Sequence, residues 1–137
     1  VGKVRDKNLA KICQKFTKRI NHDINFEDIL IKDSGKQKEN LKILKYMKAD
    51  DGFHIAMSEE GEHVDSKGLA LLLKSRSEKI TFIIGGPDGL SGLVKETANM
   101  NLSLSSLTFT HEMAKAFLLE QLYRAISIIN HRKYHRS

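Results

Sequence analysis

A glycine-rich turn directly after an apolar segment is the first feature of this sequence that can do chemistry. Residues 80–84 are apolar, β-branched or aromatic, a composition typical of a strand covered on both faces. Residues 85–89 then read Gly-Gly-Pro-Asp-Gly, and the three glycines let the backbone approach a ligand closely. No Lys-Ser or Lys-Thr pair follows Gly89, and the spacing differs from the dinucleotide-binding fingerprint. A plain strand-to-helix turn is the alternative interpretation.

A second candidate segment lies further along the chain, at residues 102–110. It is short, apolar and rich in hydroxyl groups, and it ends just before a long helical pattern. Two loops of this kind on neighbouring segments form a pocket that reads a ligand through main-chain donors and acceptors. The sequence therefore predicts a binding site for a small polar cofactor.

Charged residues towards the C-terminus are the third candidate. Arg124 lies in an otherwise apolar helical pattern, where a guanidinium needs an anionic or carbonyl partner. A salt bridge to Glu120, one turn earlier, is the alternative. Residues 131–136 interleave cations with an aromatic ring, which suits phosphate contact and base stacking, or else form a frayed basic tail. His131 and His135 have a metal-compatible spacing, but the flanking cations and the lack of a third ligand argue against a metal.

Alternating helices and strands must position these candidates. Apolar residues at helical spacing predict the helices, with Ser66 as the predicted N-cap of the third, and short apolar runs bounded by turn residues predict the strands. The alternation predicts an α/β fold with a mostly parallel sheet and flanking helices, in a single domain of residues 1–137. The predicted helices cover residues 6–19, 38–48, 66–74, 91–99 and 111–129, the predicted strands cover residues 26–31, 53–57, 80–84 and 102–104, and the predicted turns cover residues 33–36 and 59–62.

The last helix carries the strongest pattern. Thr110 is its predicted N-cap, and its apolar residues cover more than one stripe of the surface. A helix of this kind must be buried on more than one side. In so small a domain one side can face the sheet and the other a second subunit, so the sequence predicts a homodimer.

Composition limits the function classes. The formal net charge is +6, and basic residues crowd both ends of the chain, which favours a polyanionic partner. The single cysteine, Cys13, is a predicted core residue; it excludes an internal disulfide and suits a reducing compartment. No segment approaches the ~20 apolar residues needed to span a bilayer, and no signal-peptide pattern is present. We expect a soluble cytoplasmic protein.

Three motifs, taken in order, resemble one family. They are Ile-Gly-Gly-Pro-x-Gly-Leu-Ser at residues 84–91, Leu-Ser-Leu-Ser-x-Leu-Thr at residues 102–108 with the histidine after it, and Leu-Glu-Gln-Leu-Tyr-Arg-Ala at residues 119–125 with Tyr134-His135 beyond. They resemble the RlmH family, the ribosomal RNA large-subunit pseudouridine N3-methyltransferases of the SPOUT superfamily. The opening Val-Gly-Lys is also similar. The resemblance is strong over residues 53–137 and looser over residues 1–50.

The resemblance implies a fold with a C-terminal trefoil knot, a homodimer, S-adenosylmethionine as cofactor, and large-subunit ribosomal RNA or the assembled ribosome as partner. It also implies that the glycine turn and the second loop bind the cofactor, while residues near the C-terminus face the RNA and the reacting base. His135 is the candidate to accept the N3 proton. The implied cofactor-binding residues are Met57, Gly85, Leu104, Ser105, Ser106, Leu107, Thr108 and Phe109, and the implied catalytic residues are His135, Tyr134 and Arg124.

The chain departs from the family pattern in three places. No strand precedes Val1 as it does in the family, so we expect either a sheet without that edge strand or a chain that continues upstream. Thr110 replaces a frequent proline and can still cap the helix. The region between Ile31 and Phe53 is shorter than usual, which makes the alignment of its helix uncertain.

Two rival functions use fewer of these features. A non-catalytic basic RNA-binding protein fits the charge but leaves the two pocket loops unexplained. A nucleotide-binding α/β enzyme fits the glycine turn but lacks the lysine and carboxylates that such sites supply.

Overall fold

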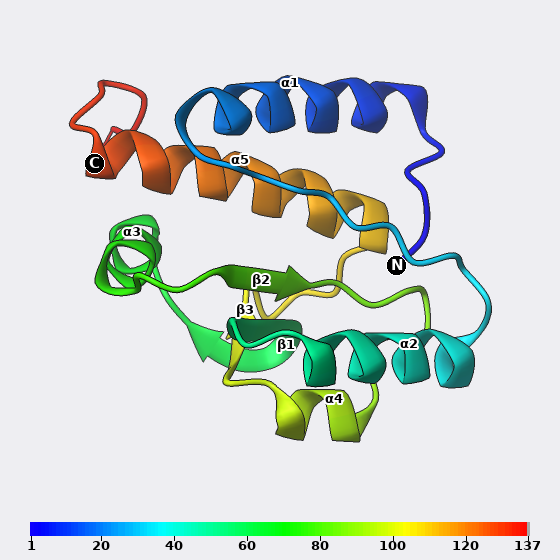
Figure 1. Ribbon diagram of the computed structural model, residues 1–137. Helices are drawn as coiled ribbons and strands as arrows, with labels where there is room; N and C mark the ends of the chain where they lie inside the picture. Colours follow the sequence, from blue (N-terminus) through cyan, green and yellow to red (C-terminus); the bar gives the residue numbers. More distant parts are fainter. Residues whose placement is uncertain (137) are drawn as a thin grey trace.

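Three parallel strands form the centre of the computed structural model, which describes residues 1–136 (Figure 1). The central strand β1 (Phe53–His63) lies between β2 (Ile80–Ile83) and β3 (Met100–Ser103), and it pairs with both in parallel. All three carboxyl ends therefore lie along one edge of the sheet, the edge at which open α/β sheets bind ligands. The prediction of an α/β fold with a parallel sheet is confirmed.

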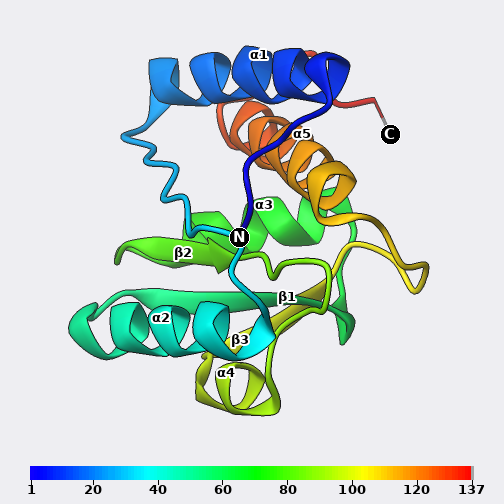
Figure 2. The same cartoon turned by 90° about the vertical axis from the view of Figure 1, so that its right-hand side faces the viewer.

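Helices cover both faces of this sheet. The helices are α1 (Lys7–Asp23), α2 (Lys36–Ala49), α3 (Ser66–Ser75), α4 (Gly92–Thr97) and α5 (His111–Ile129). On one face α5 and α3 pack against the strands, and α1 lies outside α5; α2 and α4 cover the other face (Figures 1 and 2). Within residues 1–136, no helix combines the length and the apolar character needed to cross a bilayer.

Alternation along β1 divides the core into two parts. Successive side chains of a strand point to opposite faces. Ile55 is fully buried with Leu69 of α3 and Ala125 of α5. Its neighbour Ala56 is fully buried on the opposite face with Ile43 of α2 and Val94 of α4, among others. The sheet is thus fixed from both sides, which holds the ends of its strands in place.

The last helix has the predicted bounds, and the Thr110 hydroxyl caps it by accepting a hydrogen bond from the Met113 N–H at 3.2 Å. Its outer side packs against Phe16 and Ile20 of α1, and Cys13 lies in the same core cluster, as predicted. Helix α1 therefore covers much of the apolar surface that the sequence assigned to a second subunit. A half-exposed face remains at Phe117, whose exposed fraction is 42%.

The prediction of a strand at residues 26–31 is wrong. A strand needs a paired neighbour along its length, yet within residues 1–136 the only backbone bond of this segment outside helices and strands joins the Gly2 N–H to the Ile31 carbonyl at 2.9 Å. The exposed Ile29 and Leu30 give it little apolar burial either. The sheet has no edge strand from this part of the chain.

The predicted turn at residues 59–62 is also wrong, because β1 continues through it. The register with β3 shifts there: Leu102 pairs with both Met57 and Glu62, so the residues between them bulge. Gly61 permits the shift, since a Cβ at this position would lie 2.6 Å from the Asn101 carbonyl carbon. The bulge turns residues 58–60 towards the edge where the strands end. One N-cap also differs, because Asp65, not Ser66, caps α3 by accepting the Gly68 N–H at 2.7 Å.

Candidate functional site

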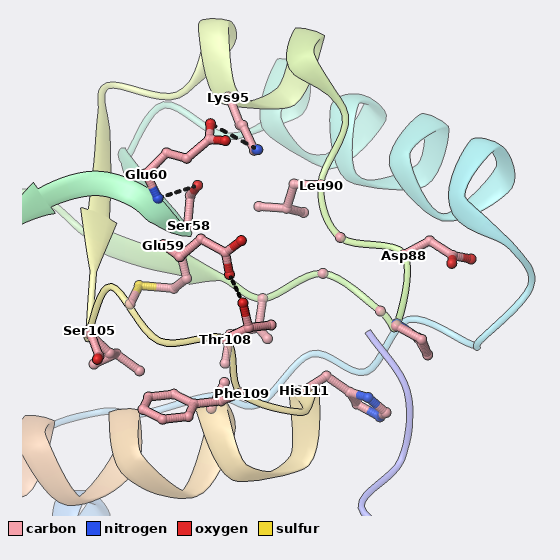
Figure 3. Close-up of a pocket in the computed structure, with 18 of the residues that line it drawn as sticks. Ser58, Glu59, Glu60, Asp88, Leu90, Lys95, Ser105, Thr108, Phe109 and His111 are labelled. Atoms are coloured by element: carbon pink, nitrogen blue, oxygen red, sulfur yellow. Dashed lines mark hydrogen bonds and ion pairs between the residues drawn. The ribbon is translucent and has the colours of Figure 1, made fainter.

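The main cavity of the described residues lies at the carboxyl edge of the sheet, with a volume of about 370 Å³ (Figure 3). Its walls are the glycine turn (residues 85–90) after β2, the second loop (residues 104–109) after β3, and the bulged part of β1. A volume of this size suits a small-molecule ligand. The two loops that the sequence singled out do share one pocket. The predicted cofactor-binding residues among its lining are Met57, Gly85, Leu104, Ser105, Leu107, Thr108 and Phe109.

The glycine turn is fixed by close backbone contacts. The Gly89 N–H donates to the Gly86 carbonyl at 2.9 Å and closes the turn. At Gly85 a Cβ would lie 2.7 Å from the Gly89 carbonyl carbon, so a side chain cannot be accommodated without moving the backbone. Helix α2 supports the turn through Asn40, which accepts the Ser91 N–H at 2.8 Å. The resulting shape exposes main chain to the cavity.

Hydroxyl groups fix the second loop. The Ser103 hydroxyl donates to the Ser105 carbonyl at 2.8 Å, and the Ser105 hydroxyl accepts the Leu107 N–H at 3.0 Å. The Thr108 hydroxyl donates to the Glu59 carboxylate at 2.9 Å, which joins this loop to the bulged part of β1 across the cavity (Figure 3). The serine-rich composition is thus explained by local turns rather than by direct ligand contact alone.

Ser106 is the one predicted cofactor-binding residue that does not line the cavity. Its hydroxyl is exposed and lies 3.4 Å from Nε2 of His63.

Sequence reasoning missed several polar residues of the cavity. Glu59 and Glu60 were assigned to a turn, although their position just beyond the apolar part of β1 was a signal that they lie at the ligand edge. Lys95 of α4 lies 3.9 Å from the Glu60 carboxylate, and His111 begins α5 beside the second loop. The missed polar lining residues are Lys36, Ser58, Glu59, Glu60, Asp88, Lys95 and His111.

Arg124, Tyr134 and His135 form a second cluster. The Arg124 Nη1 lies 3.3 Å from Nδ1 of His135, and its guanidinium carbon lies 4.8 Å from the centre of the Tyr134 ring. The guanidinium also donates from Nε and Nη2 to one oxygen of Glu120, at 2.8 and 2.5 Å, so the salt bridge considered from the sequence is confirmed. Burial raises the pKa of the Tyr134 hydroxyl, and the nearby Glu120 carboxylate adds to this effect.

This cluster lies away from the cavity of its own chain. None of its three residues lines the cavity, whereas His111, thirteen positions before Arg124 on α5, does. At 1.5 Å rise per residue the two positions are separated by about 20 Å along the helix. The cofactor pocket and the catalytic candidates are therefore at opposite ends of α5.

Contacts with α1 hold the C-terminal segment. Arg132 forms an ion pair with Asp23 at the end of α1, with Nη1 donating to Oδ2 at 2.7 Å, and this contact lowers the pKa of Asp23. The Tyr134 ring lies edge-on to Tyr123 at 4.8 Å between centres, and Arg19 of α1 lies 5.4 Å from the same Tyr123 ring. The basic tail is thus packed rather than frayed as far as Tyr134. Among residues 1–136 no group of three or more His, Cys, Asp or Glu side chains is placed to hold a metal ion.

Comparisons with known proteins give matches over nearly the whole chain. A family model described as predicted SPOUT methyltransferase matches residues 1–135. Three curated relatives each carry the name ribosomal RNA large subunit methyltransferase H. The relative from Ureaplasma parvum serovar 3 is 38% identical over 153 residues, covering 99% of this chain and 96% of the relative. That from Acholeplasma laidlawii is 40% identical over 144 residues (99% and 95%), and that from Coprothermobacter proteolyticus is 37% identical over 140 residues (99% and 95%).

Proposed function

Since this chain belongs to the RlmH family of SPOUT methyltransferases, we propose that it transfers a methyl group from S-adenosylmethionine to N3 of a pseudouridine in 23S ribosomal RNA. The observation that carries the proposal is the single cavity that gathers Met57, Gly85 and the second loop. Neither a non-catalytic RNA-binding protein nor a general nucleotide-binding enzyme explains this cavity together with the family match.

The cavity suits the cofactor in three respects. Met57, Leu104 and Phe109 supply apolar surface for a purine ring, and the main chain of both loops supplies hydrogen-bonding groups for its edge. At Gly85 the backbone comes close enough to its neighbours that only a residue without a Cβ fits. Charged side chains of both signs line the wall, matching a ligand that carries both positive and negative groups. We assign cofactor binding to the seven predicted residues that line the cavity, which are Met57, Gly85, Leu104, Ser105, Leu107, Thr108 and Phe109. For Ser106 the assignment is proposed from the family resemblance alone.

The bound cofactor supplies an electrophilic methyl group, so the protein's task is to place N3 in line with it and to remove the N3 proton. Orientation of this kind contributes up to ~7–11 kcal/mol in well-oriented systems. The Arg124 Nη1 donates a hydrogen bond to the His135 Nδ1 at 3.3 Å. A bound base replaces this bond, and the pair then offers it a donor beside an acceptor. A uracil-type base presents the complementary pair, a carbonyl oxygen beside N3–H. Arg124 thus donates to the carbonyl, His135 accepts the N3 proton, and the Tyr134 ring orients the base.

The separation of the two clusters leads us to propose a homodimer in which each active site is shared. Phe117 lies midway between His111 and Arg124 on α5, and its side chain is partly exposed. A two-fold axis crossing α5 near Phe117 would bring Arg124 of one subunit to the cavity of the other. Leu107, 71% exposed at the rim of the cavity, adds apolar surface on that side. Light scattering at micromolar concentration should give the mass of a dimer, and a monomer mass would contradict the proposal.

We also propose that residues 85–91 and 102–110 take part in a trefoil knot, and that the protein acts in the cytoplasm, where ribosomal RNA is modified. The position of β1 between β2 and β3 supports the knot, because the loops after both outer strands converge on one cavity.

Replacing Gly85 by Ala should weaken S-adenosylmethionine binding strongly. The new Cβ would lie 2.7 Å from the Gly89 carbonyl carbon, and moving a packed backbone costs about 1–3 kcal/mol. At about 1.4 kcal/mol per tenfold change, we expect the dissociation constant measured by calorimetry to rise roughly 5- to 150-fold. Gly92→Ala is the matched control, because nothing lies within 4 Å of a Cβ there. Equal affinity of the two variants for S-adenosylmethionine would contradict the assignment of the glycine turn to the binding site.

The proposed reaction is tested by incubating the protein with S-adenosylmethionine labelled in its methyl group and with large ribosomal subunits that lack this modification. We expect one labelled nucleotide in the 23S RNA, and mass spectrometry of its nucleosides should identify N3-methylpseudouridine. Labelling of uridine, or of another ring position, would contradict the proposed specificity.

A further inference from the structure

Four lysines form a continuous stripe on α1. Lys7, Lys11, Lys15 and Lys18 follow one another at spacings of four, four and three residues, which places them on one face of the helix. All four are exposed. The stripe is opposite the buried residues Cys13, Phe16 and Ile20 that pack against α5. Because α1 is the outermost layer above α5 (Figure 1), this lysine face points away from the rest of the fold.

The charge of this face is not balanced by neighbouring acids. Between its N-cap Asp6 and its last residue Asp23, α1 contains no Asp or Glu. Asp23 is already paired with Arg132 of the C-terminal segment. Within residues 1–136 none of the four lysines forms an ion pair, so the face is a concentrated positive charge available to a partner.

Arg19 connects the lysine face of α1 with the side of the helix that meets the catalytic cluster. Arg19, next to Lys18, lies 5.4 Å from the Tyr123 ring, and Tyr123 packs against Tyr134. The pair of Asp23 with Arg132 fixes the end of α1 to the segment that carries His135. A nucleic-acid strand bound along α1 would therefore extend to the cluster that is proposed to bind the base.

We propose that the lysine face of α1 binds the sugar-phosphate backbone of the RNA substrate beside the target nucleotide. The inference rests on the proposed function and adds a substrate-binding surface to it. Lysines four positions apart are separated by about 6 Å along the helix, and the whole stripe spans about 17 Å. It can contact several successive phosphates without reading bases, and such contacts position the RNA without specifying its sequence.

The experiment compares two variants of equal charge change. In the first, Lys7, Lys11, Lys15 and Lys18 are replaced by Gln; in the control, Lys38, Lys42, Lys45 and Lys48 of α2 are replaced by Gln. The control lysines are also exposed, but they lie on the opposite side of the sheet from the catalytic cluster (Figures 1 and 2). Affinity for purified large ribosomal subunits is measured by fluorescence anisotropy of the labelled protein at several KCl concentrations, and affinity for S-adenosylmethionine by calorimetry.

We expect the α1 variant to bind ribosomal subunits at least tenfold more weakly than wild type at about 100 mM KCl. Each lost phosphate contact lowers the slope of log affinity against log salt by ~0.7–0.9, so the slope should fall by about 3. The α2 variant should keep most of the affinity and the slope. Equal losses in the two variants, or no loss in the α1 variant, would overturn the proposal. The calorimetry distinguishes failure of this proposal from failure of the proposed function. If the wild type binds no S-adenosylmethionine, the proposed function fails. If wild type and α1 variant bind it equally, a change in ribosome affinity reports on the lysine face alone.

Discussion

Replacing His135 by Ala is expected to lower the single-turnover rate of RNA methylation about 10²- to 10⁴-fold, the usual contribution of a positioned general base. The Nδ1 of His135 accepts a hydrogen bond from the Arg124 guanidinium. A bound base that replaces this bond finds an acceptor for its N3–H and a donor for its carbonyl group. Since His135 does not line the cavity of its own subunit, the affinity for S-adenosylmethionine should change far less than the rate.

Two controls distinguish proton removal from a structural effect. His131→Asn changes a neighbouring exposed histidine. Asn tolerates the φ of 57° that His131 adopts, so this variant should retain near-normal methylation. Raising the pH should restore part of the rate in His135→Ala, because the N3 proton then leaves to solvent without the imidazole. A His135→Ala variant with near-normal single-turnover methylation would remove His135 from the role of base.

Mixing two impaired variants is expected to add activity equal to about one quarter of the wild-type level. The partners are Gly85→Ala, defective in the pocket, and His135→Ala, defective in the C-terminal segment. If each site uses the pocket of one subunit and the segment of the other, every mixed dimer contains one site built entirely from intact parts. Random exchange places about half of the subunits in mixed dimers, and each such dimer has one active site of two.

The assay must be run with S-adenosylmethionine near the wild-type dissociation constant, where the Gly85→Ala pocket is filled roughly 3- to 75-fold less than the wild-type pocket. The activity of Gly85→Ala alone is then subtracted. Each variant mixed with itself is the control, and it should remain at its own low activity. If both parts of a site came from one subunit, every subunit in the mixture would carry a defect, and no activity would return. That result would contradict the shared site.

The elements that carry the pocket were largely predictable because their signals are local. The helix at His111–Ile129 and its Thr110 cap follow from apolar spacing and a hydroxyl at the N-cap, and both are confirmed. The glycine turn and the second loop share a cavity because parallel strands end at one edge of the sheet, a rule that needs no knowledge of distant contacts.

Features that depend on distant partners were not predictable. Residues 26–31 have the composition of a strand, but whether a segment becomes one depends on a neighbour with which to pair, and here the neighbour is lacking along most of its length. The extension of β1 through Glu59 and Glu60 depends on β3 and on the close approach at Gly61. The separation of Arg124 from the cavity, by contrast, follows from the helical spacing between His111 and Arg124 on α5, and it is the basis of the proposed shared site.

A crystal structure of the protein with S-adenosylmethionine tests the central claim most directly. We predict that the cofactor lies between residues 85–90 and residues 104–109 in contact with Met57, and that its methyl group points to Arg124 and His135 of the other subunit. A cofactor bound elsewhere, or bound in this cavity with no residue of a second subunit near its methyl group, would contradict the account.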